Sequence, residues 1–242
     1  MTAARGGDEI TLSGPPRNAS AVVRLDSPGR EAVPIRITLA GQPAIYRAHV
    51  RPLGSGTSEV RLRLPDETPP GTYSGQGPLG GRQRGIVVEV EPVLRLRVQP
   101  KRTSLSLEVG ARSEFGLTIV NGGNVPFDVP TGAGFELDDA EGQDRALGRA
   151  LRATLAEGER RVDRFFEEIR ADLGGEARVA VREGAGRLEP GEARELTCLL
   201  EVPATVQAGR SYLGAWTLGN ASHVIVVEVT KGASPNSGRK IG

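Results

Sequence analysis

The stretch Ile225–Val229, which reads Ile-Val-Val-Glu-Val, occurs a second time, letter for letter, as Ile86–Val90. Upstream of both copies, further identical residues stand in the same order, with a single one-residue gap. They are Leu79 and Leu218, Gly80 and Gly219, Gly75 and Gly214, Tyr73 and Tyr212, Gly71 and Gly209, and Pro65 and Pro203. So many identities in one order indicate an internal duplication. The sequence therefore predicts two tandem copies of one domain type.

The composition favours short strands and frequent turns. The chain has 242 residues, which suits two domains of ordinary size. It contains 33 Gly and 17 Pro without a regular period, and only 4% aromatic residues, so aliphatic side chains must fill the cores. The formal net charge of +1 argues against strong nonspecific attraction to nucleic acid or to an acidic membrane. The single cysteine, Cys198, rules out an internal disulfide.

The first copy is predicted to contain seven strands. From Ile10 onward, short runs of alternating apolar and polar residues are separated by Gly, Pro, Asn and Asp, a pattern typical of half-buried strands. The runs are Glu9–Leu12, Ala21–Leu25, Val33–Leu39, Ile45–Val50, Val60–Leu64, Thr72–Gly75 and Ile86–Glu91. In the fifth run, Val60, Leu62 and Leu64 share one face, which we expect to be the core side. Seven strands within residues 9–92 is the count of an immunoglobulin-like (Ig-like) sandwich.

The chain is expected to divide into four segments. Residues 1–8 are small and polar and are predicted to form a flexible arm. Residues 9–92 form the first Ig-like domain, and residues 93–230 form the second. Because no Gly/Ser-rich spacer separates these domains, we expect a short and stiff linker. Residues 231–242 form a polar tail whose composition predicts disorder in isolation, and we expect it to become ordered on assembly with a partner.

Turn sequences in the second copy resemble those of a known group of modules. The run Val120–Pro126 reads as a strand end, an Asn-Gly-Gly-Asn turn and a new strand. Leu188–Glu192 precedes a strand that ends in Val202–Ala204, and Ala208–Tyr212 follows. These motifs resemble bacterial Ig-like β-sandwich modules of the α-galactosidase-associated and CARDB-type groups. The resemblance covers both copies at their turns and strand edges, and it implies a mostly β fold of two tandem Ig-like sandwiches without implying an activity.

The second copy is too long for a sandwich alone. Corresponding positions lie 138 residues apart at Pro65 and Pro203, whereas one sandwich needs about 100. We assign the surplus to an α-helical insertion, residues 138–173, whose apolar residues recur at steps of three, four or seven. They are Leu147, Leu151, Leu155, Val162, Phe166, Ile169 and Leu173. Asp138, Asp139 and Asp144 would place negative charge near the helix start. Gly158 interrupts the pattern, which leaves open one long helix with a weak point or a two-helix hairpin.

The apolar stripe of this insertion has to be covered, and three interpretations remain open. The helix folds back over a sheet of its own domain, it docks on another protein, or it inserts into a membrane surface. Docking on a protein would bury Leu151, Leu155, Phe165, Phe166 and Ile169 as partner-binding anchors.

No catalytic, cofactor-binding or metal site is expected. Gly75–Gly80 spells G-x-G-x-x-G, but its proline and the duplication place it in a hairpin between strands rather than before a helix. The two histidines, His49 and His223, form no metal or catalytic cluster in the sequence, and Cys198 lies on an apolar strand face that is typical of a buried structural thiol. Asp138–Glu141 lacks the glycine and the spacing of a calcium loop. No pair of carboxylates is singled out for glycoside hydrolysis. We therefore predict a protein that is not an enzyme and needs no cofactor or small-molecule substrate.

Arginines alternate with apolar residues in several of the predicted strands. These arginines are Arg47, Arg51, Arg61, Arg63, Arg95 and Arg97, and Lys101 and Arg102 follow closely in the sequence. These side chains could form a basic surface for phosphate or acidic lipid, or they could be the solvated outer faces of the sheets. The balanced net charge favours the solvated faces.

These observations predict a non-catalytic structural or accessory subunit, a scaffold that docks on protein partners in a larger bacterial assembly through its Ig-like domains, helical insertion and tail. The alternative is an Ig-like module that binds carbohydrate or an envelope polymer. We expect no nucleic-acid partner and at most an indirect membrane association. The sequence shows no signal peptide or transmembrane run. The expected location is therefore cytoplasmic or peripheral on the cytoplasmic side of a membrane complex, or the envelope or exterior if a leader was removed.

Overall fold

The structure is a computed structural model that describes residues 9–26, 29, 31–39, 41–154, 160–171 and 173–230. The predicted arm and tail, residues 1–8 and 231–242, lie outside the described residues. Internal contacts divide the chain into two compact units. Unit 1 comprises the chain up to Arg95 together with residues 121–127 and 189–192, and unit 2 comprises the remainder. Strands dominate both units, and two short helices belong to unit 2.

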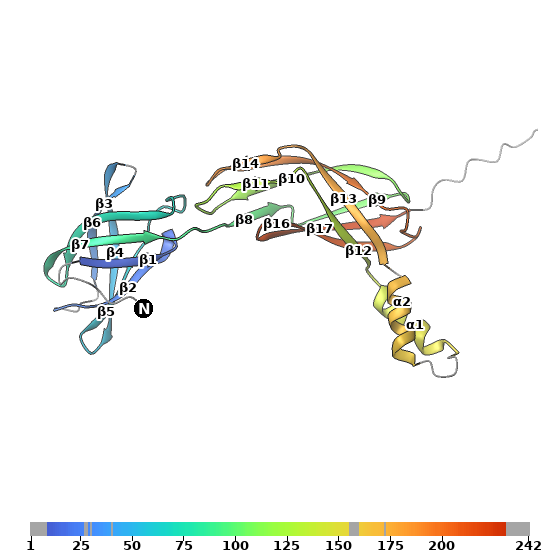
Figure 1. Cartoon of the computed structure of the whole chain (residues 1–242), viewed down its shortest axis with the longest axis horizontal. Coiled ribbons are helices and arrows are strands. Elements are labelled where there is room, and N and C mark those ends of the chain that lie inside the picture. Colours follow the sequence, from blue (N-terminus) through green and yellow to red (C-terminus); the bar gives the residue numbers. More distant parts are fainter. Residues whose placement is uncertain are drawn as a thin grey trace, which may run out of the picture. The chain divides into compact units, whose positions relative to one another are not determined.

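Unit 1 is built from seven strands and one 3-10 turn (Figure 1). The elements are β1 (Glu9–Gly14), η1 (Pro16–Asn18), β2 (Ala19–Arg24), β3 (Glu31–Leu39), β4 (Gln42–Gly54), β5 (Thr57–Leu62), β6 (Gly71–Leu79) and β7 (Arg82–Val90). Each of the seven runs predicted from the sequence overlaps one of these strands. The core face predicted for the fifth run is confirmed, because Val60, Leu62 and Leu64 are all buried in the aliphatic core of this unit.

The seven strands form one closed sheet, where the sequence led us to expect two separate sheets. The order is β1-β2-β5-β4-β3-β6-β7, and the ends of this series meet. The closure depends on β1, which runs parallel to β7 along its whole length and also meets β2 where Ser13 lies opposite Ser20. On the other side, β3 joins β6 only through Arg36 and Ile37. Narrow connections at these two places therefore close the sheet into a barrel.

Unit 2 contains an eight-stranded sheet and a separate two-stranded sheet. The strands are β8 (Leu96–Gln99), β9 (Arg102–Leu107), β10 (Arg112–Asn121), β11 (Phe127–Val129), β12 (Gly132–Asp139), β13 (Leu173–Glu183), β14 (Gly186–Leu188), β15 (Ala193–Glu201), β16 (Ser211–Leu218) and β17 (Ala221–Val229). The large sheet has the order β8-β10-β15-β13-β12-β16-β17-β9, and β11 pairs with β14. The sequence pattern does not predict β12 or β14. In β12, Gly132 and Gly134 weaken the local strand signal.

The two units share one strand order, as the duplication requires. The repeated stretch forms β7 in unit 1 and β17 in unit 2. Each of these strands pairs antiparallel with the strand before it and parallel with an early strand of its unit, β1 or β9. Continuing around the sheet, β2-β5-β4-β3-β6-β7-β1 corresponds strand by strand to β10-β15-β13-β12-β16-β17-β9. The two copies therefore share their strand order as well as their repeated residues.

The two helices stand between strands that form a simple hairpin in the other unit. In unit 1, β3 and β4 pair up to their adjoining ends, where Leu39 lies opposite Gln42. In unit 2, the corresponding strands β12 and β13 are joined through α1 (Gly142–Arg152) and α2 (Arg161–Ala171). Of the two forms that the sequence left open, the described residues show two separate helices. Gly158 lies between them, outside the described residues.

Candidate protein-docking surface

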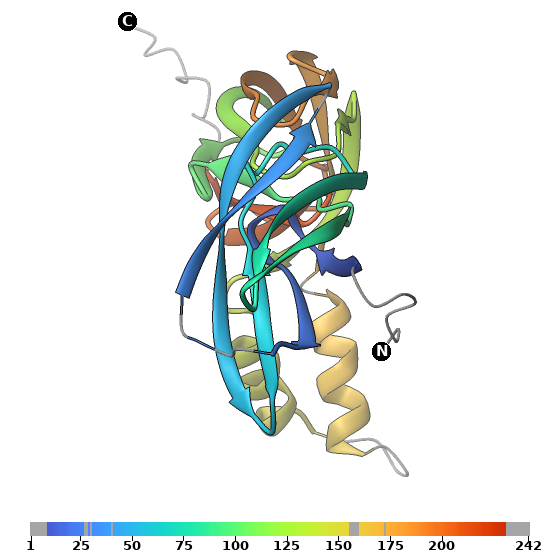
Figure 2. The same ribbon diagram turned by 90° about the vertical axis from the view of Figure 1, so that its left-hand side faces the viewer.

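The two helices form a hairpin that extends from the ends of β12 and β13. Figures 1 and 2 both show α1 and α2 side by side and joined to the sheet of unit 2 at one end. The hairpin therefore does not fold back over the sheet of its own unit, which was one of the interpretations left open by the sequence. Helices in this position leave most of their outer surface available for contact.

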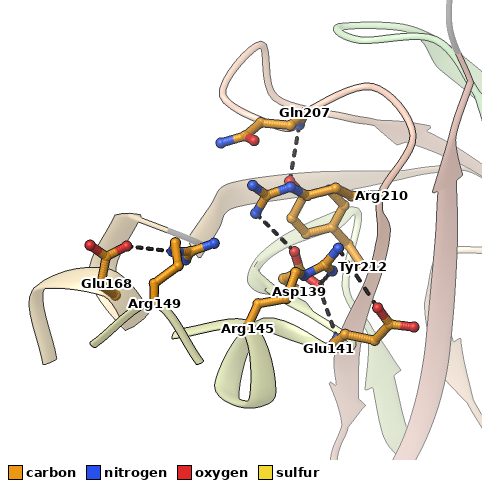
Figure 3. Close-up of polar contacts among 8 residues, drawn as sticks. All are labelled: Asp139, Glu141, Arg145, Arg149, Glu168, Gln207, Arg210 and Tyr212. Carbon is orange, nitrogen blue, oxygen red and sulfur yellow. Dashed lines mark hydrogen bonds and ion pairs between the residues drawn. The ribbon is translucent and has the colours of Figure 1, made fainter. Parts of the chain in front are cut away.

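Small residues and ion pairs hold the two helices together. Ala146 and Ala150 of α1 are buried, and their small side chains let α2 approach closely. Arg149 of α1 pairs with Glu168 of α2, with 2.5 Å between Nε and Oε2 (Figure 3). Arg161 of α2 donates from Nη1 to the carbonyl of Leu151 at 2.8 Å, which satisfies an acceptor at the C-terminal end of α1. These contacts use few large apolar side chains.

The large apolar side chains of the helices are exposed instead. Leu147, Leu151, Val162 and Phe166 are each between 47% and 59% exposed. Leu173, at the start of β13, and Leu213, on β16, are also exposed near the base of the hairpin. These six are the majority of the ten exposed large apolar residues among the described part of the chain. Exposed apolar side chains that gather on one element are typical of a protein interaction site.

A buried carboxylate anchors the base of the hairpin. Asp139, the last residue of β12, has a fully buried side chain that pairs with Arg145 of α1. It also accepts from Arg210 Nη1 at 3.0 Å and from the Glu141 N–H at 2.9 Å (Figure 3). The sequence analysis treated Asp139 as a charge near a helix start. The structure places it in β12, where it joins the hairpin to the segment that leads into β16.

A hollow of about 400 Å³ lies where the hairpin meets the sheet. Ile169, Leu173 and Leu213 provide its apolar lining. Its acidic lining includes Asp138 and Asp144, for which the described residues provide no ion-pair partner. The hollow therefore combines an apolar surface with negative charge. It has the chemistry to accept an aliphatic side chain that lies beside a basic group.

The predicted anchor residues fall in different places. Leu151 and Phe166 are exposed, as docking requires, whereas Phe165 is half-buried and lies 5.8 Å from Phe166 between ring centroids. Ile169 is half-buried and lines the hollow. Leu155 lies outside the described residues. The structure adds Leu147 and Val162, which the helical pattern already contained. It also adds Leu213, which comes from a distant strand and carried no sequence signal.

Of the side chains considered for catalysis, Cys198 and His223 are buried in unit 2, whereas His49 is exposed on β4 of unit 1. Burial raises the pKa of the Cys198 thiol to about 11, so the thiol is protonated and poorly nucleophilic at neutral pH. The prediction of a buried structural thiol is confirmed. Burial lowers the pKa of His223, whose Nδ1 donates to the Pro100 carbonyl at 2.9 Å while its ring stacks on Phe115. This histidine is a neutral core residue.

The described residues do not form the nucleotide-binding or metal-binding geometry considered from the sequence. The glycine-rich run Gly75–Gly80 lies in β6 and its turn to β7, so it does not precede a helix. No cluster of three or more His, Cys, Asp or Glu side chains that could hold a metal ion occurs within the described part of the chain. None of the described helices is long and apolar enough to span a membrane.

Comparisons with known proteins do not identify a family. No family model matches the chain, and no curated protein matches it. Solved structures that are similar include Dpr11 IG1 bound to DIP-gamma, with 12% identity over 94% of this chain and 98% of that chain and a TM-score of 0.32. An I-band fragment of titin has 10% identity over 94% and 63%, with a TM-score of 0.36. The PapD-like domain 7 of human CEP192 has 12% identity over 60% and 94%, with a TM-score of 0.31. These scores are too low to carry an argument.

Proposed function

We propose that this chain is a non-catalytic structural or accessory subunit that docks on a protein partner in a larger bacterial assembly through its helical hairpin. The supporting observation is the gathering of exposed apolar side chains on α1, α2 and the adjoining strands. A stable subunit rarely leaves such a surface on a projecting element unless another molecule covers it. The ion pairs of Asp139 with Arg145 and Arg210, which we call the Asp139 cluster, tie the hairpin to its strands, so we expect the surface to be preformed for binding.

We further propose that residues 9–92 and 93–230 are two Ig-like domains that serve as the rigid scaffold. Their common strand order supports this proposal. A second support comes from two equivalent tyrosines. The Tyr73 hydroxyl donates to the Pro69 carbonyl at 2.7 Å, and the Tyr212 hydroxyl accepts from the Gln207 N–H at 2.9 Å. Such a bond from a tyrosine near a strand start to the backbone a few residues upstream is a hallmark of Ig-like domains.

The hairpin surface fits a protein partner whose contact residues are apolar and flanked by basic groups. Its apolar residues would be buried as anchors, while Asp138 and Asp144 at the hollow would face lysine or arginine of the partner. An anionic membrane surface fits less well, because these carboxylates would be repelled by acidic lipids. We propose that the assembly lies in the cytoplasm or on the cytoplasmic side of a membrane complex, or in the envelope or exterior if a leader was removed. The alternative of a carbohydrate-binding module is not favoured, because Trp216 and Tyr212 are buried.

The test is co-purification from native extract with the double variant Leu151→Asp and Phe166→Asp. Both side chains are exposed, so the variant should fold like the wild type, which circular dichroism and Trp216 emission will check. We expect it to lose partners that the wild-type chain captures. The matched control is Leu53→Asp with Val109→Asp, which alters two exposed apolar residues outside the hairpin and should retain them. Retention of the same partners by the hairpin variant would contradict the proposed docking surface.

A further inference from the structure

Unit 1 carries a second surface, of opposite charge, on strands β3, β4 and β5. Successive residues of a strand point to opposite faces. Ala48 and Val50 of β4 are buried, so Arg47, His49 and Arg51 point outward. The same alternation places Arg36 of β3 and Arg61 of β5 on the outer side of their strands. Five outward side chains that carry or can carry positive charge therefore lie on three neighbouring strands.

Strand register brings these side chains together. Arg61 lies directly opposite His49, and Arg51 lies opposite Glu59. Arg36 lies opposite Ile45, which places Arg36 diagonally from Arg47 across the β3–β4 pair. Diagonal neighbours on one face are about 7–8 Å apart, within reach of arginine side chains. We call the set Arg36, Arg47, Arg51 and Arg61 the arginine face.

The arginine face has far fewer carboxylates than guanidinium groups. Among the outward positions of β3, β4 and β5, the one carboxylate is Glu59. Arg61 donates to Glu59 Oε1 at 2.8 Å and Arg51 Nη2 lies 3.1 Å from Oε2. The hydrogen bond from Arg61 lowers the pKa of Glu59, so this carboxylate is ionised. Both of its oxygens already pair with an arginine of the same face. Within the described residues, Arg36 and Arg47 have no ion-pair partner.

The face also offers apolar contact beside its unpaired arginine. Ile45 is 65% exposed next to Arg36. A hollow of about 270 Å³ adjoins them, lined by Pro34, Arg36, Ile45, Gln76 and Pro78 among others. Gly77 of β6 also lines it, and a Cβ at this position would lie 2.8 Å from the Pro34 carbonyl oxygen. The Arg36 guanidinium, the Gln76 amide and apolar side chains thus border one depression.

We propose that the arginine face is an interaction surface for an acidic segment of a protein partner, one that carries apolar residues among its Asp or Glu side chains. Carboxylates would pair with Arg36 and Arg47, and an apolar side chain would occupy the hollow beside Ile45. A purely phosphate-based polyanion would leave the hollow and Ile45 unused. This proposal does not depend on the helical hairpin, since the two surfaces use different residues and opposite charges.

The test uses the full chain and a fluorescent peptide in which Glu residues are interrupted by Leu at every third position. Fluorescence anisotropy measures its affinity, which should fall with added salt because the pairing is electrostatic. We expect Arg36→Gln with Arg47→Gln to weaken binding about fivefold, since two exposed charge pairs contribute on the order of 1 kcal/mol in total. Ile45→Ser should weaken it as well, which a purely electrostatic surface would not predict.

Matched controls make the outcome decisive. Arg97→Gln with Arg102→Gln removes two exposed arginines of unit 2 and should leave the affinity unchanged. A peptide with Lys in place of Glu should not bind. The proposal is overturned if the acidic peptide fails to bind, or if both double variants lose affinity equally. Tighter binding of inorganic polyphosphate or of vesicles rich in anionic lipid, abolished by the same Arg36 and Arg47 substitutions, would also overturn it in favour of phosphate recognition.

Discussion

At the scale of single residues, Asp139 joins the end of β12 to the nearby helix α1 through Arg145 and to a distant segment through Arg210, 71 residues away. Replacement by Asn keeps the shape and one acceptor but removes the charge that faces Arg145 and Arg210. Breaking such a buried pair is costly, although the partial exposure of both arginines reduces the penalty to about 2 kcal/mol. We expect Asp139→Asn to lower the stability of unit 2 by that amount. Denaturant unfolding followed by the emission of Trp216, the single tryptophan of the chain, measures it.

The neighbouring carboxylate is a suitable control for that experiment. Asp138 is exposed and lines the hollow at the hairpin base without an ion-pair partner in the described residues. Asp138→Asn should leave the unfolding midpoint almost unchanged. Equal effects of the two substitutions would show that the Asp139 cluster does not stabilise the hairpin base.

His223 predicts how stability depends on pH. Burial lowers its pKa in the folded protein, outweighing the opposing effect of the bond to Pro100. As the pH falls through the ordinary value of 6.5, the unfolded chain takes up a proton that the folded chain does not. The free energy of unfolding should therefore decrease as the pH falls from the ordinary value of 6.5 towards the lowered pKa of the folded state, and increase again as the pH is raised. The Trp216 transition, recorded from about pH 5 to pH 8, should show this slope in the wild type.

Variants separate His223 from the other titrating groups. His223→Gln should flatten the part of the pH profile that lies near the ordinary histidine value. His49→Gln is the matched control, because His49 is exposed on β4, and it should keep the wild-type slope. An unchanged slope in His223→Gln would mean that other groups cause the pH dependence.

At the scale of elements, one glycine is present at the same position of both repeats and has no room for a side chain. Gly75 of β6 and Gly214 of β16 occupy equivalent places where these strands cross β3 and β12. A Cβ at Gly75 would lie 2.5 Å from the Arg36 carbonyl oxygen, and a Cβ at Gly214 would overlap the Phe135 ring. Both glycines therefore allow the close approach at the corner of each sheet.

We expect Gly214→Ala to lower the stability of unit 2 by about 2 kcal/mol, because the Phe135 ring must move within a packed core. Gly116 of β10 provides the control, since the nearest atom to an added Cβ there is the Leu196 carbonyl oxygen at 3.9 Å. Gly116→Ala should change stability by less than about 0.5 kcal/mol. Trp216 emission during denaturant unfolding compares the two variants, and similar midpoints would contradict the close-approach argument.

At the scale of the whole molecule, each unit has its own main sheet and its own interior. The core cluster of unit 1 contains residues from Ile10 to Val90 alone. Leu62→Ala at the centre of that cluster should destabilise unit 1 by about 2–5 kcal/mol, because the side chain is fully buried. Circular dichroism should then show an earlier transition for part of the signal, while the Trp216 transition of unit 2 stays in place. Leu53→Ala, at an exposed position of β4, should affect neither signal.

A common shift of both signals in Leu62→Ala would show that the two units unfold as one cooperative system. Separate transitions would instead agree with two domains that evolved from one duplicated sequence and kept separate cores. The two proposed surfaces also belong to different units, the hairpin to unit 2 and the arginine face to unit 1. A chain of this kind can contact two partners, or two parts of one partner, with opposite charge preferences.

The amino-acid sequence by itself determined the features that depend on local order. The duplication follows from repeated letters, and the seven strands of unit 1 and their core face follow from a period of two in residues such as Val60, Leu62 and Leu64. The buried state of Cys198 follows from the same pattern. Helical periodicity likewise indicated where the apolar residues of α1 and α2 would fall.

Only the tertiary structure decided which residues meet across long sequence distances. Arg210 reaches Asp139 from 71 residues away, and Leu213 joins Ile169 at the hollow, because β16 lies beside β12. Arg36 belongs to the arginine face only through its register with β4, and β1 closes the sheet of unit 1 only because it pairs with both β7 and β2. Periodicity specifies which way a side chain points along its own strand. Pairing between distant strands specifies what it faces, and the order of letters along one strand does not contain that information.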